Sequence, residues 1–67
     1  MTAQEILEEA TKLYTVSDRL RALAEENAPV AEALSLLAKS VHRSATLLEV
    51  MVAVKLGPEA AVEKQSN

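Results

Sequence analysis

The most constrained part of this 67-residue chain reads Ala45-Thr46-Leu47-Leu48-Glu49-Val50-Met51-Val52-Ala53-Val54-Lys55-Leu56. Nine of these twelve residues are apolar, and the three polar ones leave no polar face on a helix. Since a single apolar stripe is enough to pack a surface helix on one neighbour, this stretch needs cover from more than one side. A chain this short has few other residues that could cover the stretch, so we expect a second copy of the chain to cover it.

The beginning of the chain predicts an amphipathic helix over residues 3–26. The segment Thr2-Ala3-Gln4-Glu5 fits the capping box, in which the Thr and Glu side chains each bond to the other's backbone amide. After it, apolar or small residues recur at alternating spacings of three and four, as on one face of a helix. They are Ala3, Ile6, Ala10, Leu13, Ser17, Leu20 and Ala24. Because Asn tolerates the left-handed conformation that often ends a helix, we expect Asn27 to be the C-cap.

A second helix is predicted over residues 29–56, since Pro29 suits a first helical turn. Gly57-Pro58 ends this helix, and residues 58–67 are expected to form a flexible tail. The apolar stripe of this second helix consists of Val30, Leu34, Leu37, Val41, Ser44, Leu48 and Met51. Beside the stripe runs a series in which small residues would let another helix approach closely: Ala31, Ala38, Ala45 and Val52.

The short link between the two predicted helices makes them antiparallel neighbours. Folding the chain back there places Leu48 and Met51 beside Ile6 and Leu7. The sequence therefore predicts an all-α fold, in which residues 1–57 form a two-helix antiparallel hairpin that dimerises into a four-helix bundle. One alternative stays open, a short strand that pairs with its copy, because β-branched residues favour strands and apolar residues also alternate at Val50, Val52, Val54 and Leu56.

The composition excludes several classes of protein. With no cysteine and one histidine, neither disulfides nor a zinc site of the His/Cys kind can stabilise this small chain. The formal net charge of −3 argues against general nucleic-acid binding. We see neither an export signal nor the run of about 20 apolar residues that spans a bilayer. We therefore expect a cytoplasmic protein without a membrane partner.

No set of residues suggests catalysis. His42 is the only side chain suited to proton transfer near neutral pH, and none of its helical neighbours three and four residues away is an acid. We expect a solvated surface histidine, and we expect no catalytic residue, cofactor or metal. Tyr14 lies within the apolar stripe, where a buried hydroxyl normally finds a hydrogen-bond partner. Ser17 and Ser44 are the candidates for that partner.

These observations predict a non-enzymatic module that acts through protein–protein contact, as a homo-oligomer (a dimer or a tetramer) or with another, unidentified protein. The predicted interface residues are Leu47, Val50, Met51, Ala53 and Val54. One alternative is an apolar small molecule or lipid in a cavity of the bundle, lined by Leu48, Met51, Val52, Ile6 and Tyr14. Another is nucleic-acid regulation through the only basic cluster, which consists of Lys39, His42 and Arg43.

The layout resembles the Rop-type helical hairpin, a small RNA-binding regulator that dimerises into a four-helix bundle. The similarity consists of Met1-Thr2 and Gln4-Glu5 at the start, two helices joined near residue 28, and Leu56-Gly57 at the end. It implies an RNA-binding face on the first helices, where Tyr14 matches the aromatic residue of the family. The basic and polar residues expected around that ring are absent, and their positions hold Ala3, Ala10, Asp18 and Glu25. RNA binding depends on phosphate neutralisation by Lys and Arg, so the resemblance implies the architecture and not the activity.

Overall fold

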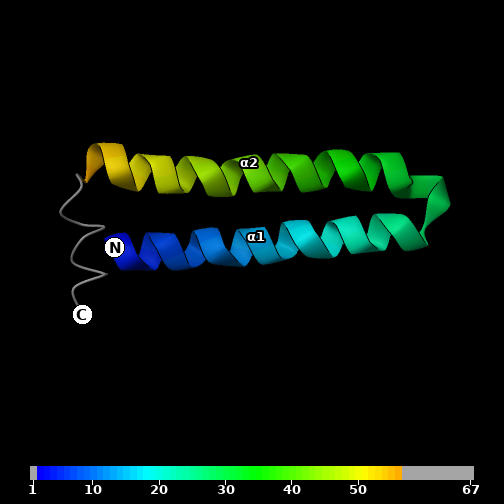
Figure 1. Ribbon diagram of the computed structural model, residues 1–67, viewed down its shortest axis with the longest axis horizontal. Coiled ribbons are helices and arrows are strands. Elements are labelled where there is room, and N and C mark those ends of the chain that lie inside the picture. Colours follow the sequence, from blue (N-terminus) through cyan, green and yellow to red (C-terminus); the bar gives the residue numbers. More distant parts are fainter. Residues whose placement is uncertain (1, 57–67) are drawn as a thin grey trace.

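The chain folds back on itself as two long antiparallel helices that lie side by side (Figure 1). The structure, a computed structural model, describes residues 2–56. Helix α1 spans Ala3–Glu26, a short 3-10 turn η1 spans Ala28–Val30, and helix α2 spans Ala31–Lys55. The all-α, two-helix antiparallel hairpin is therefore as predicted, whereas Gly57-Pro58 and the expected tail at 58–67 lie outside the described residues.

Helix α1 begins with the predicted capping box. The Thr2 hydroxyl accepts a hydrogen bond from the backbone amide of Glu5 at 3.1 Å, and the Glu5 carboxylate accepts one from the Thr2 amide at 2.9 Å. These bonds satisfy two amides that have no partner inside the helix. They fix the start of α1 one residue after Thr2, as the sequence predicts.

The link differs in detail from the prediction. Asn27 is the C-cap of α1, as predicted, but its φ of −131° and ψ of 74° are not the expected left-handed conformation. Its side-chain amide instead donates a hydrogen bond to the carbonyl of Leu23 at 2.8 Å, which satisfies an otherwise unpaired carbonyl without a left-handed residue. Pro29 lies in η1, and the α-helix begins at Ala31 rather than at residue 29.

Helix α2 is continuous through the apolar stretch at its end. The backbone amide of Leu56 still donates to the carbonyl of Val52 at 3.1 Å, the spacing of an α-helix. The alternative of a strand over residues 50–56 is therefore wrong. No turn residue separates this segment from the helical pattern before it, and the helix continues through the β-branched residues.

Small side chains line the contact between the two helices. The fully or nearly fully buried residues recur at a spacing of seven, and they are Ala10, Ser17 and Ala24 on α1 and Ala38, Ala45 and Val52 on α2. We call these six residues the seam. Ser17 is the one polar member, and its hydroxyl donates to the carbonyl of Ala38 at 2.8 Å. Because no seam side chain is larger than that of Val52, the two backbones can approach closely. The Ser17 hydrogen bond requires this approach, since it joins a short side chain to the backbone of the other helix.

The seam corrects the predicted packing of α2. The leucine-rich stripe was expected to face α1, yet Leu37 is 54% exposed and Met51 is 41% exposed, and Ser44 is exposed as well. The small-residue series faces α1 instead of the leucine-rich stripe. This arrangement brings the two backbones close together, which allows both helices to bury side chains along their whole length. The large residues of α2 then lie beside the contact, where they are only partly covered.

Candidate association surface

A polar cluster marks one side of the hairpin. The Tyr14 hydroxyl donates to a carboxylate oxygen of Glu49 at 2.7 Å and lies 3.0 Å from the Thr46 hydroxyl. Tyr14 and Glu49 each follow a seam residue by four positions, so these bonds place the two positions on the same side of the seam. The ring of His42, which also follows a seam residue by four, packs edge-on against Tyr14 at a centroid distance of 5.0 Å. We call this the polar side.

The cluster also answers the question of the Tyr14 partner. Ser17 and Ser44 were expected, and both are wrong, because Ser17 donates to a backbone carbonyl and Ser44 lies away from the polar side. Thr46 and Glu49 take their place. The sequence carried a signal for them, since both are polar interruptions in the apolar stretch that begins at Ala45.

The opposite side of the seam is apolar on both helices. A helix turns by about 100° per residue, so positions three and four after a seam residue lie on opposite sides of it. Three positions after Ala24 and Val52, at the ends of the seven-residue series of buried or small residues, lie the exposed residues Asn27 and Lys55. The positions three residues after the other six members are all apolar and half-buried. They are Ile6, Leu13 and Leu20 on α1 and Leu34, Val41 and Leu48 on α2. We call these six residues the apolar side, and within the described hairpin nothing packs over them.

The two helices differ at the outer edge of the apolar side. The α1 edge contains five charged residues among eight, and it consists of Thr2, Glu5, Glu9, Lys12, Val16, Arg19, Leu23 and Glu26. The α2 edge contains no charged residue, and it consists of Val30, Ala33, Leu37, Ser40, Ser44, Leu47, Met51 and Val54. All eight residues of the α2 edge are exposed. Uncovered apolar surface therefore continues from the apolar side onto α2 but ends at the charges of α1.

The five predicted interface residues are all exposed, but they do not form one patch. Met51, Leu47 and Val54 belong to the α2 edge, and Val54 is 69% exposed. Val50 and Ala53 lie further around the helix, away from the apolar side. Sequence reasoning missed the six residues of the apolar side as an uncovered surface, because it assigned all six to the contact between the two helices. The seven-residue series of small residues was the signal that could have distinguished the contact between the helices from the uncovered surface.

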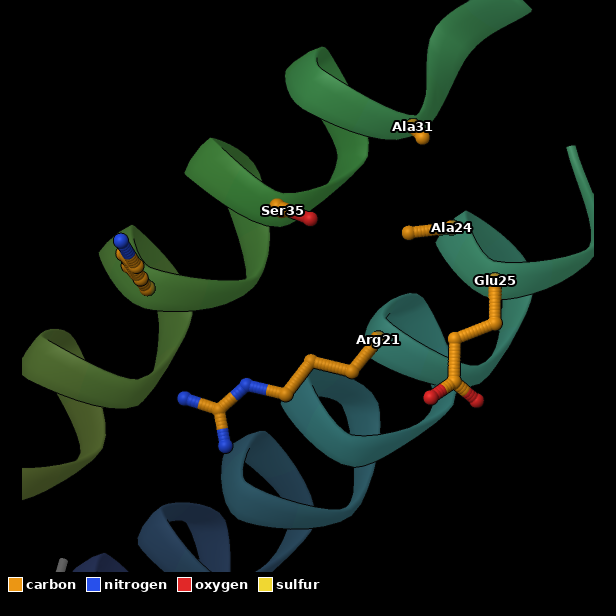
Figure 2. A pocket seen from close by; sticks show the side chains of 6 residues that line it. Arg21, Ala24, Glu25, Ala31 and Ser35 are labelled. Atoms are coloured by element: carbon orange, nitrogen blue, oxygen red, sulfur yellow. The ribbon is translucent and has the colours of Figure 1, made fainter. Parts of the chain in front are cut away.

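An open groove lies on the polar side near the link (Figure 2). Its volume is about 440 Å³, and its lining consists of Arg21, Ala24, Glu25, Ala31, Ser35 and Lys39. Figure 2 shows the Ser35 hydroxyl and the Ala24 methyl group directed toward one another, while the Glu25 carboxylate is directed away from α2. None of the residues predicted to line an apolar cavity belongs to this groove. Of the predicted basic cluster, only Lys39 reaches it.

Residues 2–56 contain neither a candidate metal site nor a helix suited to spanning a membrane. That part of the chain holds no group of three or more His, Cys, Asp or Glu side chains that could bind a metal ion. Neither helix in it combines the length and the apolar character needed to cross a membrane.

The Tyr14 cluster predicts a change in stability at high pH. The hydrogen bond with Thr46 lowers the pKa of Tyr14, but the bond to Glu49, desolvation and the Glu49 charge together raise it above the ordinary value of 10.0. Because the folded-state pKa is raised, this stabilisation is fully present below pH 10 and is lost as the pH rises through the folded-state pKa. We expect Glu49→Gln to lower the midpoint of phenolate absorbance. An equal midpoint for the folded and the urea-unfolded wild-type protein would contradict this.

No protein family, curated protein or solved structure matches this chain. The structure shows a two-helix antiparallel hairpin, and no family is identified for it.

Proposed function

We propose that this protein is a non-enzymatic association module that pairs with a second copy of itself through the apolar side and the α2 edge. The observation that supports this most strongly is the continuous apolar surface left uncovered on a hairpin of only two helices. Soluble monomers rarely expose contiguous apolar patches of more than a few hundred Å², and larger ones mark sites of association.

The small size of the core supports the same proposal. Five of the six seam residues are alanine or valine, so burial along the seam removes little apolar surface from water. A chain of this length needs an additional source of stability, such as a disulfide, a metal or a partner. The sequence contains no cysteine, and a second hairpin would bury the half-covered leucines of the apolar side.

Two hairpins that meet through their apolar sides would form a four-helix bundle. Such bundles pack their helices around one shared apolar core, which neither hairpin has alone. Each hairpin would supply one layer of two helices. The polar side, with its Tyr14 cluster, would stay in contact with water.

Sedimentation velocity of the full chain at concentrations from about 1 to 100 μM, the range in which moderate protein–protein affinities are resolved, tests this function. We expect a single folded species with the mass of a dimer, or of a tetramer if the bundle associates further. A chain that is helical by circular dichroism and has the mass of a monomer throughout this range would overturn the proposal.

A further inference from the structure

We infer that the second copy binds in one defined way, with α1 against the α1 of the other copy and α2 against the other α2, each pair antiparallel about one two-fold axis. This inference rests on the proposed self-association and adds its geometry. Two-fold symmetric dimers are the commonest oligomers, and in them the same surface patch is used by both copies. Two face-to-face arrangements of antiparallel neighbours are possible here, since α1 could instead lie over α2 of the other copy.

The two edges distinguish these arrangements. If α1 lay over α2 of the other copy, the charged α1 edge would run along an edge without a single charged residue. Charges such as Glu5 and Arg19 would then lose water without gaining a partner, which is costly. If like helices pair, the uncharged α2 edges cover one another and the charged α1 edges meet. The segregation of charge between the two edges therefore favours the pairing of like helices.

The charges of α1 are arranged so that an antiparallel copy complements them. With the axis beside Leu13, in the middle of α1, residues whose numbers sum to 26 lie level, so Arg19 of the second copy lies within two residues, about 3 Å along the helix, of the level of Glu5. This pair occurs twice. Lys12 lies near its own copy at the axis, but it forms an ion pair with Glu9 of its own chain at 2.8 Å. Opposite charges thus meet at the ends, and the like charges at the centre are each compensated.

The apolar side has the same two-fold pattern. Leu13 and Val41 lie at one level of the hairpin, because the seam pairs Ser17 with Ala38. A two-fold axis through this level places each layer of one copy over the layer from the other side of the axis in the second copy. Each layer of the dimer then contains four apolar side chains and no charge. The exchanged layers consist of Ile6 with Leu48 and of Leu20 with Leu34.

Two adjacent leucines provide a matched test of this surface. Leu36 is 61% exposed and Leu37 is 54% exposed, but they differ by about 100° around α2. Leu37 lies on the α2 edge, where the other α2 would cover it, and Leu36 faces away. Because each dimer would bury two unpaired carboxylates, we expect Leu37→Glu to weaken dimerisation at least a hundredfold. We expect Leu36→Glu to leave the dissociation constant within about threefold of wild type, as for surface substitutions.

Cross-linking distinguishes the pairing of like helices from the alternative. The chain contains no cysteine, so single cysteines can be introduced cleanly. Ser40 lies on the α2 edge at the level of the axis, next to Val41, and would lie at the rim of the contact, close to Ser40 of the second copy. We expect Ser40→Cys to give a covalent dimer with a short bismaleimide reagent. We expect Arg43→Cys, on the outer surface one turn away, to give none.

The outcomes separate this inference from the function on which it rests. Dissociation by Leu37→Glu alone, together with cross-linking at Ser40→Cys alone, would support the geometry. A wild-type dimer that tolerates Leu37→Glu, or that does not cross-link at Ser40→Cys, would overturn the geometry and leave self-association in place. A monomeric wild-type chain would overturn both.

Discussion

Ala45→Leu is expected to remove most of the stability of the hairpin. The Ala45 side chain is fully buried in the seam, where the two backbones approach closely. A leucine there must push the helices apart along their length, and overpacking of this kind costs about 1–3 kcal/mol. Since so small a core rarely supplies more than about 3–5 kcal/mol, urea unfolding followed by circular dichroism should show a midpoint near zero.

Ala22→Leu is the matched control for this substitution. Ala22 is exposed on the outer surface of α1, so the same change of side chain meets no neighbour there. We expect the free energy of unfolding to stay within about 0.5 kcal/mol of wild type, as for ordinary surface substitutions. Equal urea midpoints for Ala45→Leu and Ala22→Leu would show that the small residues do not form the contact between the helices.

The second large effect is a melting temperature that rises with protein concentration. If folding is coupled to dimerisation, mass action makes the melting temperature depend on the concentration of the chain. With about 0.7 kcal/mol of unfolding enthalpy per residue, two hairpins of about 55 residues each give about 75 kcal/mol, which corresponds to a rise of about 6 °C per tenfold increase in concentration. Thermal melts monitored by circular dichroism over two decades of concentration measure this directly.

The variant Leu37→Glu serves as the control for coupled folding. Leu37 is exposed in the isolated hairpin, so the substitution leaves the seam and both helices intact. We expect it to melt at a lower temperature that does not change with concentration. A wild-type melting temperature that is constant over two decades would show that the hairpin is stable alone, and that its apolar side is not buried in the folded state.

Much of the fold could be predicted from local signals. Thr2 and Glu5 mark the start of α1 because the capping box needs only four consecutive residues. The position of the link follows from Asn27 and Pro29 for a similar reason, although the conformation of Asn27 does not. That residue can satisfy a carbonyl either through a left-handed backbone or through its side chain, and the sequence does not distinguish the two.

The candidate surface was predicted less well than the fold. The sequence identified an apolar excess near the end of α2, and Leu47, Met51 and Val54 do lie on an uncovered edge. It did not identify the half-buried residues Leu13 and Val41 as part of the same surface. Both a leucine stripe and an alanine series fit a helical period on α2, and periodicity alone cannot show which of them faces α1.

The sequence by itself determined two helices, their approximate ends and their antiparallel arrangement, because caps, periodicity and a short link are local properties. Only the tertiary structure decided which face of α2 meets α1. Backbones approach most closely where side chains are smallest, so Ala38 and Ala45 occupy the contact and the leucines are displaced to one side. That choice depends on both helices at once, and it produces the uncovered apolar side on which the proposed association rests.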